Sequence, residues 1–328
     1  MAEKLDLKDK KILFELDKNS RISLSELAKK VRLSKEVVFH RINNLVKRGF
    51  ILRFQTVIST YRLGYQSYKI YFKLQNLTKE IRSQIQDFFM KNEMVYWIGN
   101  CQGRWDLIIA YWAKTISDFG LFEDEILNKF SNYIQEKEIS ISRKSIQYNR
   151  RWFYYDKIEP IETTFGEELE EIKLKKIDLE ILRYLANNAR IKIIDLAKKL
   201  NVSITVIRYR LKQLEKNKVI LGYKYALNPK LLGYETCKAF IFFKNITDEK
   251  RKALINYCKL NPNVINIVLT IGPWDMEIEF EVKNFDEYYR IMNDVQEKYN
   301  DIIKSYESVL FSSEPKQSFV PGAYPKII

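Results

Sequence analysis

The sequence predicts an α+β fold in which one unit, a group of helices followed by a βαββαβ sandwich, occurs twice. The first observation is an internal repeat, because residues 33–51 (LSKEVVFHRINNLVKRGFI) return at residues 202–220 (VSITVIRYRLKQLEKNKVI), 169 residues later. Of the 31 positions in residues 21–51, 12 are identical at this shift, where chance would give about two. The second observation is helical spacing of apolar residues in both copies, and the third is the order of strands and helices after each copy.

Three helices open each copy. In the first copy, apolar spacing predicts helices over 7–17 and 23–31 and a third that starts at Ser34 and ends before Gly49. A short turn separates the last two, which is the helix-turn-helix arrangement. Residues 50–59 are then expected to form an extended wing. The second copy predicts helices over 177–186, 193–200 and 203–216 and a wing from Val219.

Alternating strand patterns and further helices follow each group. In the first copy the expected elements are strand 68–74, helix 79–91, strands 94–99 and 106–112, helix 116–130 and strand 138–148. In the second copy they are strand 238–243, helix 248–260, strands 264–271 and 275–282, helix 285–299 and strand 303–311. This βαββαβ order is the ferredoxin-like sandwich, with helices on one face of an antiparallel sheet. The open face of each sheet must therefore be covered by something else.

These patterns divide the chain into six segments. They are a first winged helix-turn-helix (1–60), a first sandwich (61–152), a linker (153–173), a second winged helix-turn-helix (174–229), a second sandwich (230–314) and a tail (315–328). The linker contains Pro160 and an acidic run, and the tail contains Pro321, Gly322 and Pro325, so the tail is expected to be irregular.

Composition excludes several classes of protein. No apolar run approaches the roughly 20 residues of a membrane helix, and the N-terminus lacks the apolar core of a signal peptide, so a cytoplasmic protein without membrane partner is expected. The three cysteines, Cys101, Cys237 and Cys258, form no close pair, which argues against a disulfide framework or a thiolate zinc site. His40 is the only histidine. We therefore expect no metal site, no cofactor and no catalytic residues.

The net charge of +14 is confined to the two helical segments. Residues 1–52 carry thirteen Lys/Arg against seven Asp/Glu (+6), and residues 174–222 carry twelve against four (+8), so the remaining residues balance to zero. Such segments can neutralise phosphates, which makes double-stranded DNA the expected partner. The alternative is a basic protein that is merely soluble.

The third helix of each copy carries the candidate DNA contacts. A serine, Ser34 or Ser203, precedes it, where a hydroxyl can cap the first turn. Apolar residues then predict one buried stripe, made of Val38, Ile42 and Leu45 in the first copy and Ile207, Leu211 and Leu214 in the second. The opposite face can enter a major groove or be only solvated. The residues predicted to contact DNA are Ser34, Lys35, Glu36, Phe39, His40, Arg41, Asn43 and Lys47, with Ser203, Ile204, Thr205, Arg208, Tyr209, Arg210, Lys212 and Lys216.

Some of these residues have a structural alternative. Arg41 and Arg210 recur in both copies, and an ion pair with Glu26 or Asp195 on the preceding helix would explain them equally well. The two reading faces differ at nearly every exposed position. We therefore expect an asymmetric operator with half-sites about one helical turn, roughly 34–36 Å, apart.

Two sets of residues resemble the Lrp/AsnC family of regulators. The first set is Glu26-Leu27-Ala28, Ser34, Arg41-Ile42, Leu45, Gly49 and Ile51, with its second version Asp195-Leu196-Ala197, Ser203, Arg210-Leu211, Leu214 and Ile220. The second is the turn Gly103-Arg104-Trp105-Asp106, echoed by Gly272-Pro273-Trp274-Asp275. The resemblance implies a DNA-binding transcription regulator, often tuned by an amino acid. Lys218 replaces the usual helix-ending glycine, so the second copy departs from the family pattern where its wing should begin.

The resemblance also has consequences for assembly and for an effector. Two polypeptides of the family pair through their sensing domains, so one chain with both halves should form an intrachain pseudo-dimer whose sheet faces pack together. Several chains can associate further. The resemblance places an effector pocket near the residues Gly103, Asp106, Gly272 and Asp275. A tight turn that needs glycine is the structural alternative.

Two rival functions remain open at this point. Siroheme decarboxylases share this fold and occur as two-copy fusions, but they depend on histidine motifs in the sensing domains, and His40 lies in the helix-turn-helix. The second rival is an architectural, chromatin-like protein that binds DNA with little sequence preference. The Lys/Ile-rich composition is typical of archaeal or AT-rich genomes.

Overall fold

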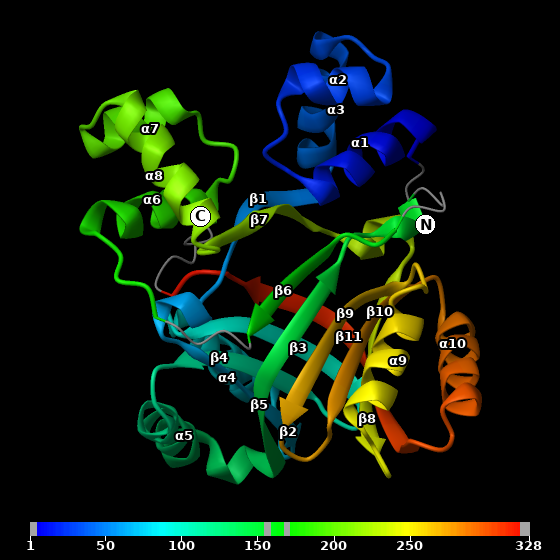
Figure 1. Ribbon diagram of the computed structural model, residues 1–328. Coiled ribbons are helices and arrows are strands. Elements are labelled where there is room, and N and C mark those ends of the chain that lie inside the picture. The colour runs from blue at the N-terminus through cyan, green and yellow to red at the C-terminus, as the bar shows by residue number, and fades with distance from the viewer. Residues whose placement is uncertain (1–4, 154–158, 167–170, 322–328) are drawn as a thin grey trace.

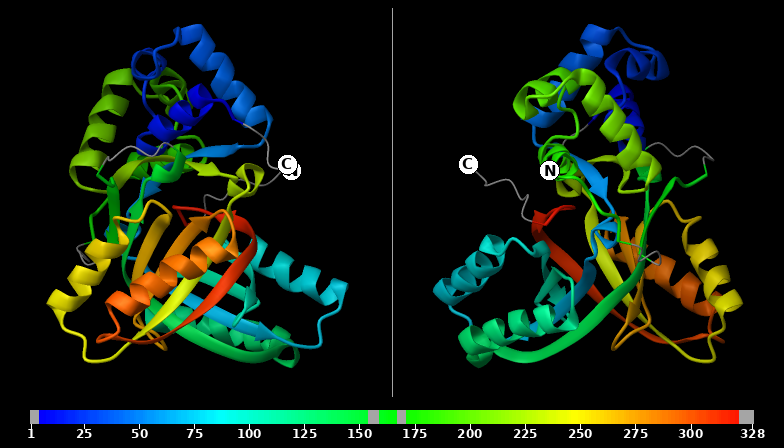
Figure 2. Two further views of the ribbon diagram at one scale, coloured as in Figure 1. Left: turned by 90° about the vertical axis from the view of Figure 1, so that its right-hand side faces the viewer. Right: turned by 60° about the vertical axis from the view of Figure 1, so that its left-hand side comes forward.

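The computed structural model describes residues 5–153, 159–166 and 171–321. Two helical groups lie at one end of the molecule, a two-stranded ribbon lies beneath them, and a strand barrel with outer helices forms the other end (Figures 1 and 2). No helix in the described ranges is both long and apolar enough to cross a membrane.

Each helical group is a helix-turn-helix unit. The helices of the first are α1 (Leu7–Lys18), α2 (Leu24–Val31) and α3 (Lys35–Lys47), and those of the second are α6 (Lys176–Asn187), α7 (Ile193–Leu200) and α8 (Ile204–Lys216). Helix α2 ends because Arg32 adopts a left-handed conformation, and Asn201 does the same after α7. The expected helices are therefore present in both copies.

The two wings are strands of one shared ribbon. Strand β1 (Ile51–Ile58) pairs antiparallel with β7 (Ile220–Leu227), so each wing finds its partner in the other half of the chain. We expected a separate wing in each copy, and instead the two wings form one sheet. Lys218 ends α8 with a φ of 54°, and β7 forms although no glycine stands there. Gly49, with a φ of 76°, ends α3 as expected.

Each half of the lower body is a ferredoxin-like sandwich. The first consists of β2 (Gln66–Leu74), α4 (Lys79–Lys91), β3 (Val95–Gly103), β4 (Leu107–Ala113), α5 (Ile116–Phe130) and β5 (Ile134–Tyr148). The second consists of β8 (Glu235–Phe243), α9 (Asp248–Cys258), β9 (Val264–Ile271), β10 (Met276–Val282), α10 (Phe285–Lys298) and β11 (Ile303–Gln317). The strand orders are β5-β2-β4-β3 and β11-β8-β10-β9. Helices α4 and α5 cover one sheet and α9 and α10 the other (Figure 1).

Among the described residues, eight strands close into a barrel that joins the halves. Strand β5 pairs with β2 through Ile134–Ile141 and then with β9 through Ile141–Gln147. Strand β11 pairs in the same way with β8 and then with β3. The expected pseudo-dimer is confirmed, and its inner sheet faces do meet in an apolar cluster that includes Trp105 and Trp274. The edge pairing that closes the ring was not foreseen.

Two segments differ from their expected character. Strand β6 (Glu162–Gly166), within the expected linker, extends the sheet beside the far end of β5. Strand β11 continues to Gln317, so the expectation that the tail is irregular from its first residue is wrong. Strand β6 lies beside the long strand β5, whereas the extension of β11 is the end of the other long strand and pairs with β3.

Candidate nucleic-acid interface

The recognition helices α3 and α8 expose the faces that the sequence predicts. The apolar stripe of each is buried, with Val38 and Ile207 completely inaccessible. Of the predicted DNA contacts, all are exposed except Arg41 and Arg210, which are half-buried. The exposed ones are Ser34, Lys35, Glu36, Phe39, His40, Asn43 and Lys47, with Ser203, Ile204, Thr205, Arg208, Tyr209, Lys212 and Lys216.

The two serines act as helix caps. The Ser34 hydroxyl accepts a hydrogen bond from the Val37 backbone N–H at 3.3 Å, and Ser203 accepts one from Val206 at 3.2 Å. These bonds fix the first turn of each recognition helix, where side chains reach base edges in helix-turn-helix complexes. The N-terminal ends of α3 and α8 are therefore both capped by a side chain.

Arg41 and Arg210 are held by ion pairs, but their partners differ from those expected. Arg41 Nη1 lies 2.7 Å from Asp6 and 2.8 Å from Asp9, and the Arg210 guanidinium pairs with Asp178. All three carboxylates belong to the first helix of their unit or its cap, whereas the expected partners Glu26 and Asp195 lie on the second. These hydrogen bonds raise the pKa of both arginines. The pairs tie the recognition helix to the first helix in each unit.

Exposed apolar side chains on the same faces were missed by the sequence reading. Val37 and Val206 are 41% and 38% exposed, beside Phe39 at 51% and Tyr209 at 58%. Apolar groups at a major-groove surface can contact thymine methyl groups. The sequence could have indicated these positions, because Val37 and Val206 are identical at the 169-residue repeat and each follows its capping serine by three positions.

Reciprocal hydrogen bonds link the two helix-turn-helix units directly. Arg21 Nη1 donates to the Ala189 carbonyl, and Arg190 Nη1 donates to the Ser20 carbonyl at 2.6 Å. Desolvation, together with the nearby Arg21, lowers the pKa of Arg190. The two arginine donors are 169 positions apart, and so are the two acceptors, Ser20 and Ala189, so these contacts follow the pseudo-two-fold symmetry of the chain.

The ribbon strengthens this link, because each strand completes the core of the opposite unit. Tyr225 and Leu227 of β7 pack in the core around α1, and Ile58 of β1 packs in the core around α6. The Ser20 N–H also donates to Tyr223 O at 2.8 Å, and Ala189 N–H donates to Phe54 O at 3.1 Å. The two recognition helices are thus held at the same end of the molecule in one fixed relation (Figures 1 and 2).

The turns expected to border an effector pocket have structural roles. A side chain at Gly103 would lie 2.7 Å from the Ser308 carbonyl, and one at Gly272 would lie 2.8 Å from the Ile139 carbonyl. Both glycines are therefore required by the long strand of the other half. Their effector role stays a prediction.

The two aspartates of these turns anchor neighbouring strands. Asp106 accepts a hydrogen bond from Leu74 N–H at 2.9 Å, and Asp275 accepts one from Phe243 N–H at 2.7 Å. Each bond ties the turn to the end of the adjacent strand, β2 or β8, in the same half. As with the glycines, contact with an effector stays a prediction for both.

Comparisons with known proteins agree with this geometry. A family model described as winged helix-turn-helix DNA-binding matches residues 5–51 and 174–220. An uncharacterised HTH-type transcriptional regulator of Pyrococcus horikoshii is 32% identical over 124 residues, which are 37% of this chain and 81% of the relative. The HTH-type regulator Ptr1 of Methanocaldococcus jannaschii is 31% identical over 31% of this chain and 68% of its own. The chain belongs to the Lrp/AsnC family.

This Lrp/AsnC-type chain is a tandem version of the family unit, since about a third of it matches most of a relative. A solved structure with both units in one chain is the siroheme decarboxylase NirDL, with a TM-score of 0.65 over 97% of this chain and 94% of that one. At 12% identity, this likeness shows the fold alone. His40, the one histidine in the sequence, lies exposed on α3.

Proposed function

We propose that this protein is a sequence-specific DNA-binding transcription regulator that inserts α3 and α8 into major grooves. The observation that carries the proposal is the placement of both exposed recognition faces at one end of the molecule, in the two segments that hold the whole net charge of +14. Phosphate contacts by these segments would give affinity, and side chains on the two faces would give specificity.

The face of α8 offers the stronger base-reading chemistry. Arg208 and Lys212 are exposed on it, and arginine is the usual partner of guanine O6 and N7. Thr205 and Tyr209 can contact thymine methyls or phosphates. The face of α3 presents Phe39 and His40 instead, so the two helices would select different bases. We therefore expect an operator whose two half-sites are unlike, about one helical turn apart.

A selection experiment followed by footprinting tests this proposal. Random DNA is enriched by binding to the full chain, sequenced, and the best site is footprinted with wild-type protein. Two unlike protected half-sites are expected. A perfect palindrome bound with equal strength on both arms would reject the asymmetric reading. A specific-to-nonspecific affinity ratio near one would favour the architectural alternative.

A pair of variants separates base reading from general charge. Arg208→Ala should weaken specific binding by about 1–3 kcal/mol and relax preference in only one half-site. Lys304→Ala is the matched control, because Lys304 is an exposed cation on β11, outside both helix-turn-helix units. Equal losses for the two variants would show that only net charge matters.

The proposal assigns regulation, and not catalysis, to the shared fold. The enzyme reading needs histidines in the sensing domains, and the sequence has only His40, on α3. An ultraviolet–visible titration with siroheme checks this, because a saturable spectral change with conversion of the pigment would revive the enzyme reading.

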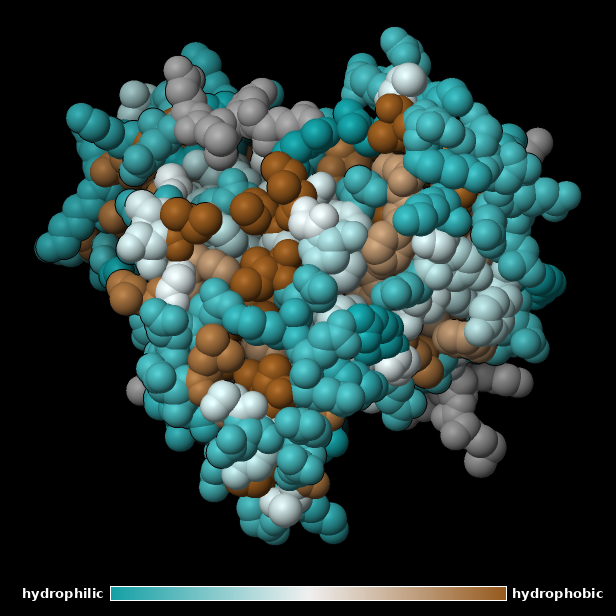
Figure 3. Space-filling model, turned by 90° about the horizontal axis from the view of Figure 1, so that it is seen from below, coloured by the Kyte–Doolittle hydropathy of each residue, from teal (hydrophilic) through white to brown (hydrophobic). Residues whose placement is uncertain are grey.

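An effector and further association complete the proposal. Calorimetry across the amino acids, with Asp106→Asn and Asp275→Asn as variants, tests the turn residues as an effector site. Helix α5 exposes Ile116 at 73% and Leu121 at 69%, and the underside shows apolar patches between polar side chains (Figure 3). Exposed apolar surface of this kind favours association of several chains, which analytical ultracentrifugation would detect.

A further inference from the structure

The centre of the β1–β7 ribbon lies on the pseudo-two-fold axis of the chain. Gln55 and Lys224 are equivalent at the 169-residue shift, and they face each other directly across the two strands. At one end of the ribbon, Ile51 and Leu227 belong to the core of the first helix-turn-helix unit. At the other end, Ile58 belongs to the core of the second unit. A bend at the centre of the ribbon would therefore change the distance between the two units.

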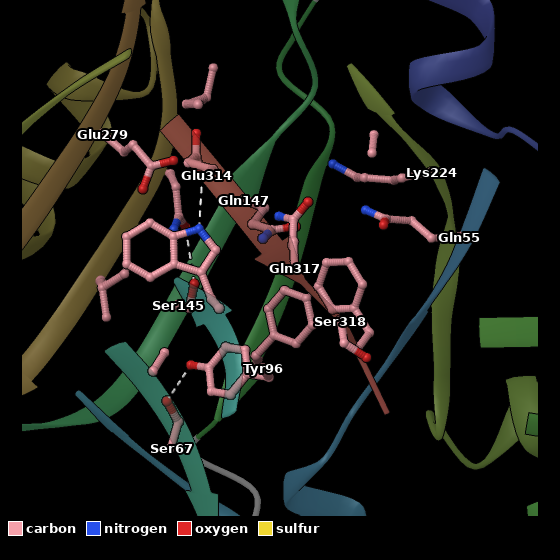
Figure 4. A pocket seen from close by; sticks show the side chains of 18 of the residues that line it. Gln55, Ser67, Tyr96, Ser145, Gln147, Lys224, Glu279, Glu314, Gln317 and Ser318 are labelled. Carbon is pink, nitrogen blue, oxygen red and sulfur yellow. Dashed lines mark hydrogen bonds between the residues drawn. The ribbon is translucent and has the colours of Figure 1, made fainter. Parts of the chain in front are cut away.

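A chamber of about 220 Å³ separates this centre from the barrel. Gln55 and Lys224 point into it from the ribbon, and Glu314 points into it from β11 (Figure 4). Burial, and then the nearby Glu279, raise the pKa of Glu314 to about 7, with Lys238 acting against both. Close packing makes protein interiors resist deformation, and here the polar chamber takes its place below the ribbon. The shape of the ribbon at its centre therefore depends on contacts at its opposite face.

Two arginines lie on that opposite face. Side chains alternate along a strand, so Phe54 and Tyr223, next to the chamber residues in sequence, lie on the face away from the chamber. The Arg190 guanidinium carbon lies 5.4 Å from the centre of the Phe54 ring. The Arg21 guanidinium carbon lies 5.5 Å from the centre of the Tyr223 ring. Each arginine therefore rests on the strand that the other half of the chain contributes.

The same two arginines join the helix-turn-helix units by reciprocal hydrogen bonds. Arg21 donates to the carbonyl of Ala189, the residue before Arg190. Arg190 Nη1 donates at 2.6 Å to the carbonyl of Ser20, the residue before Arg21, and at 3.3 Å to that of Ile22. The bonds run from the turn between α1 and α2 to the turn between α6 and α7. They bridge the axis above the centre of the ribbon.

The two guanidinium groups meet without a counter-charge. Among the described residues, neither Arg21 nor Arg190 forms an ion pair with a carboxylate. Desolvation, and then the nearby Arg21, lower the pKa of Arg190. Like charges repel, so the carbonyl hydrogen bonds and the ring contacts must outweigh this repulsion. Removing both side chains would remove the bonds together with the repulsion, so the units should become free to move without unfolding.

We propose that Arg21 and Arg190 form a clasp over the centre of the ribbon and thereby set the one spacing of half-sites that the protein accepts. This inference rests on the proposed function, because spacing matters only if α3 and α8 read DNA together. Both arginines are positioning residues, and neither needs to touch DNA. Each base pair inserted between half-sites moves one of them by about 3.4 Å and turns it by about 35°. A clasped protein cannot follow this change, whereas a ribbon that bends can.

A distance measurement without DNA tests the clasp itself. Nitroxide labels are attached at Ser25→Cys and Ile194→Cys, which are equivalent, exposed positions on α2 and α7. Pulsed electron paramagnetic resonance then records their separation in the full chain. The three native cysteines are buried, and the chain without added cysteines checks that they take no label. Wild type should give one narrow distribution, and Arg21→Met with Arg190→Met one at least about twofold wider. Equal widths would overturn the proposal.

A second measurement varies the spacing of the selected DNA site. Fluorescence anisotropy compares sites with base pairs added or removed between the half-sites. Wild type should lose at least about tenfold in affinity at each altered spacing. Arg21→Met with Arg190→Met should bind all spacings within about threefold. Lys29→Met with Lys198→Met is the matched control, because these equivalent, exposed lysines remove the same charge from the same two units. The control should lose affinity equally at every spacing and keep the wild-type preference.

A conservative variant and a folding check complete the design. Arg21→Lys with Arg190→Lys keeps two charged donors, so it should restore part of the narrow distance distribution and of the spacing preference. Circular dichroism checks that every variant folds. An unchanged spacing preference in Arg21→Met with Arg190→Met, or a relaxed preference without wider distances, overturns the proposal. If the chain binds no DNA at all, the proposed function fails, while the distance measurement still decides whether the arginines hold the units together.

Discussion

Glu277 holds together the charged cluster inside the barrel, and its removal should be costly. Lys69 Nζ lies 2.5 Å and Lys238 Nζ 3.1 Å from the Glu277 carboxylate, to which the Tyr71 hydroxyl also donates. All four side chains are buried. Replacing Glu277 with Gln leaves the buried Lys69 ammonium without an ion-pair partner among the described residues and leaves Lys238 with Glu279 alone, at 3.5 Å.

The structure gives the size of this effect in two ways. Burial alone would raise the pKa of Glu277, but Lys238 and Lys69 outweigh it and lower the pKa from 4.5 to about 2. This drop corresponds to roughly 3 kcal/mol in favour of the folded state at pH 7. Breaking a buried pair generally costs about 3–5 kcal/mol. Burial already lowers the pKa of Lys69 to about 8, so loss of its proton in the variant would limit the cost.

Urea unfolding followed by tryptophan fluorescence measures this loss, because Trp105 and Trp274 are buried beside the cluster. Glu277→Gln should lower the free energy of unfolding by about 3 kcal/mol at pH 7. A depressed carboxyl pKa stabilises the fold above pH 4.5, and this stabilisation is lost as the pH falls towards 2. The difference from wild type should therefore shrink with acid.

Two further variants make the reasoning refutable. Ile108 occupies the position equivalent to Glu277 in the first half, so the combined change Lys69→Met, Lys238→Met and Glu277→Ile should recover most of the stability. Glu249→Gln, on the exposed surface of α9, should change the free energy of unfolding by less than about 0.5 kcal/mol. A loss below about 1 kcal/mol for Glu277→Gln at pH 7 would refute the argument.

Three more predictions concern other parts of the chain. Lys218→Gly should raise the free energy of unfolding by about 1 kcal/mol, because Lys218 has a φ of 54°, and Gly49→Lys should lower it. Arg210→Met should cost about 3 kcal/mol in urea, since it leaves the fully buried Asp178 unpaired; a loss of DNA affinity alone would contradict this. The raised pKa of Glu314 lowers the stability of the wild-type fold as the pH rises from 4.5 through 7. The free energy of unfolding of Glu314→Gln, relative to wild type, should therefore be higher at pH 8 than at pH 5. Because the Glu314 side chain is exposed and water screens its charge, the gain in the free energy of unfolding should be about 1 kcal/mol. An equal gain at pH 5 and at pH 8 would exclude the raised pKa of Glu314 as its cause.

Much of the candidate interface could be predicted from sequence because its determinants are local. Ser34 and Ser203 cap the recognition helices, and the buried positions Val38 and Ile207 follow from helical spacing. Because the pattern recurs 169 residues later, the same caps and buried positions could be predicted in the second copy. The partners of Arg41 and Arg210 could not be predicted, because choosing between the first and second helix depends on how the helices pack.

The sequence by itself determined the two helix-turn-helix units, the βαββαβ order and the family, since periodicity, caps and turn glycines act within a few residues. Only the tertiary structure decided that β1 pairs with β7, that β5 and β11 close a barrel across both halves, and that Glu314 and Lys224 face one chamber. Backbone hydrogen bonds between strands are the same for every side chain. Sequence patterns therefore indicate which residues form strands, but the choice of partner strand depends on the packing of the whole chain.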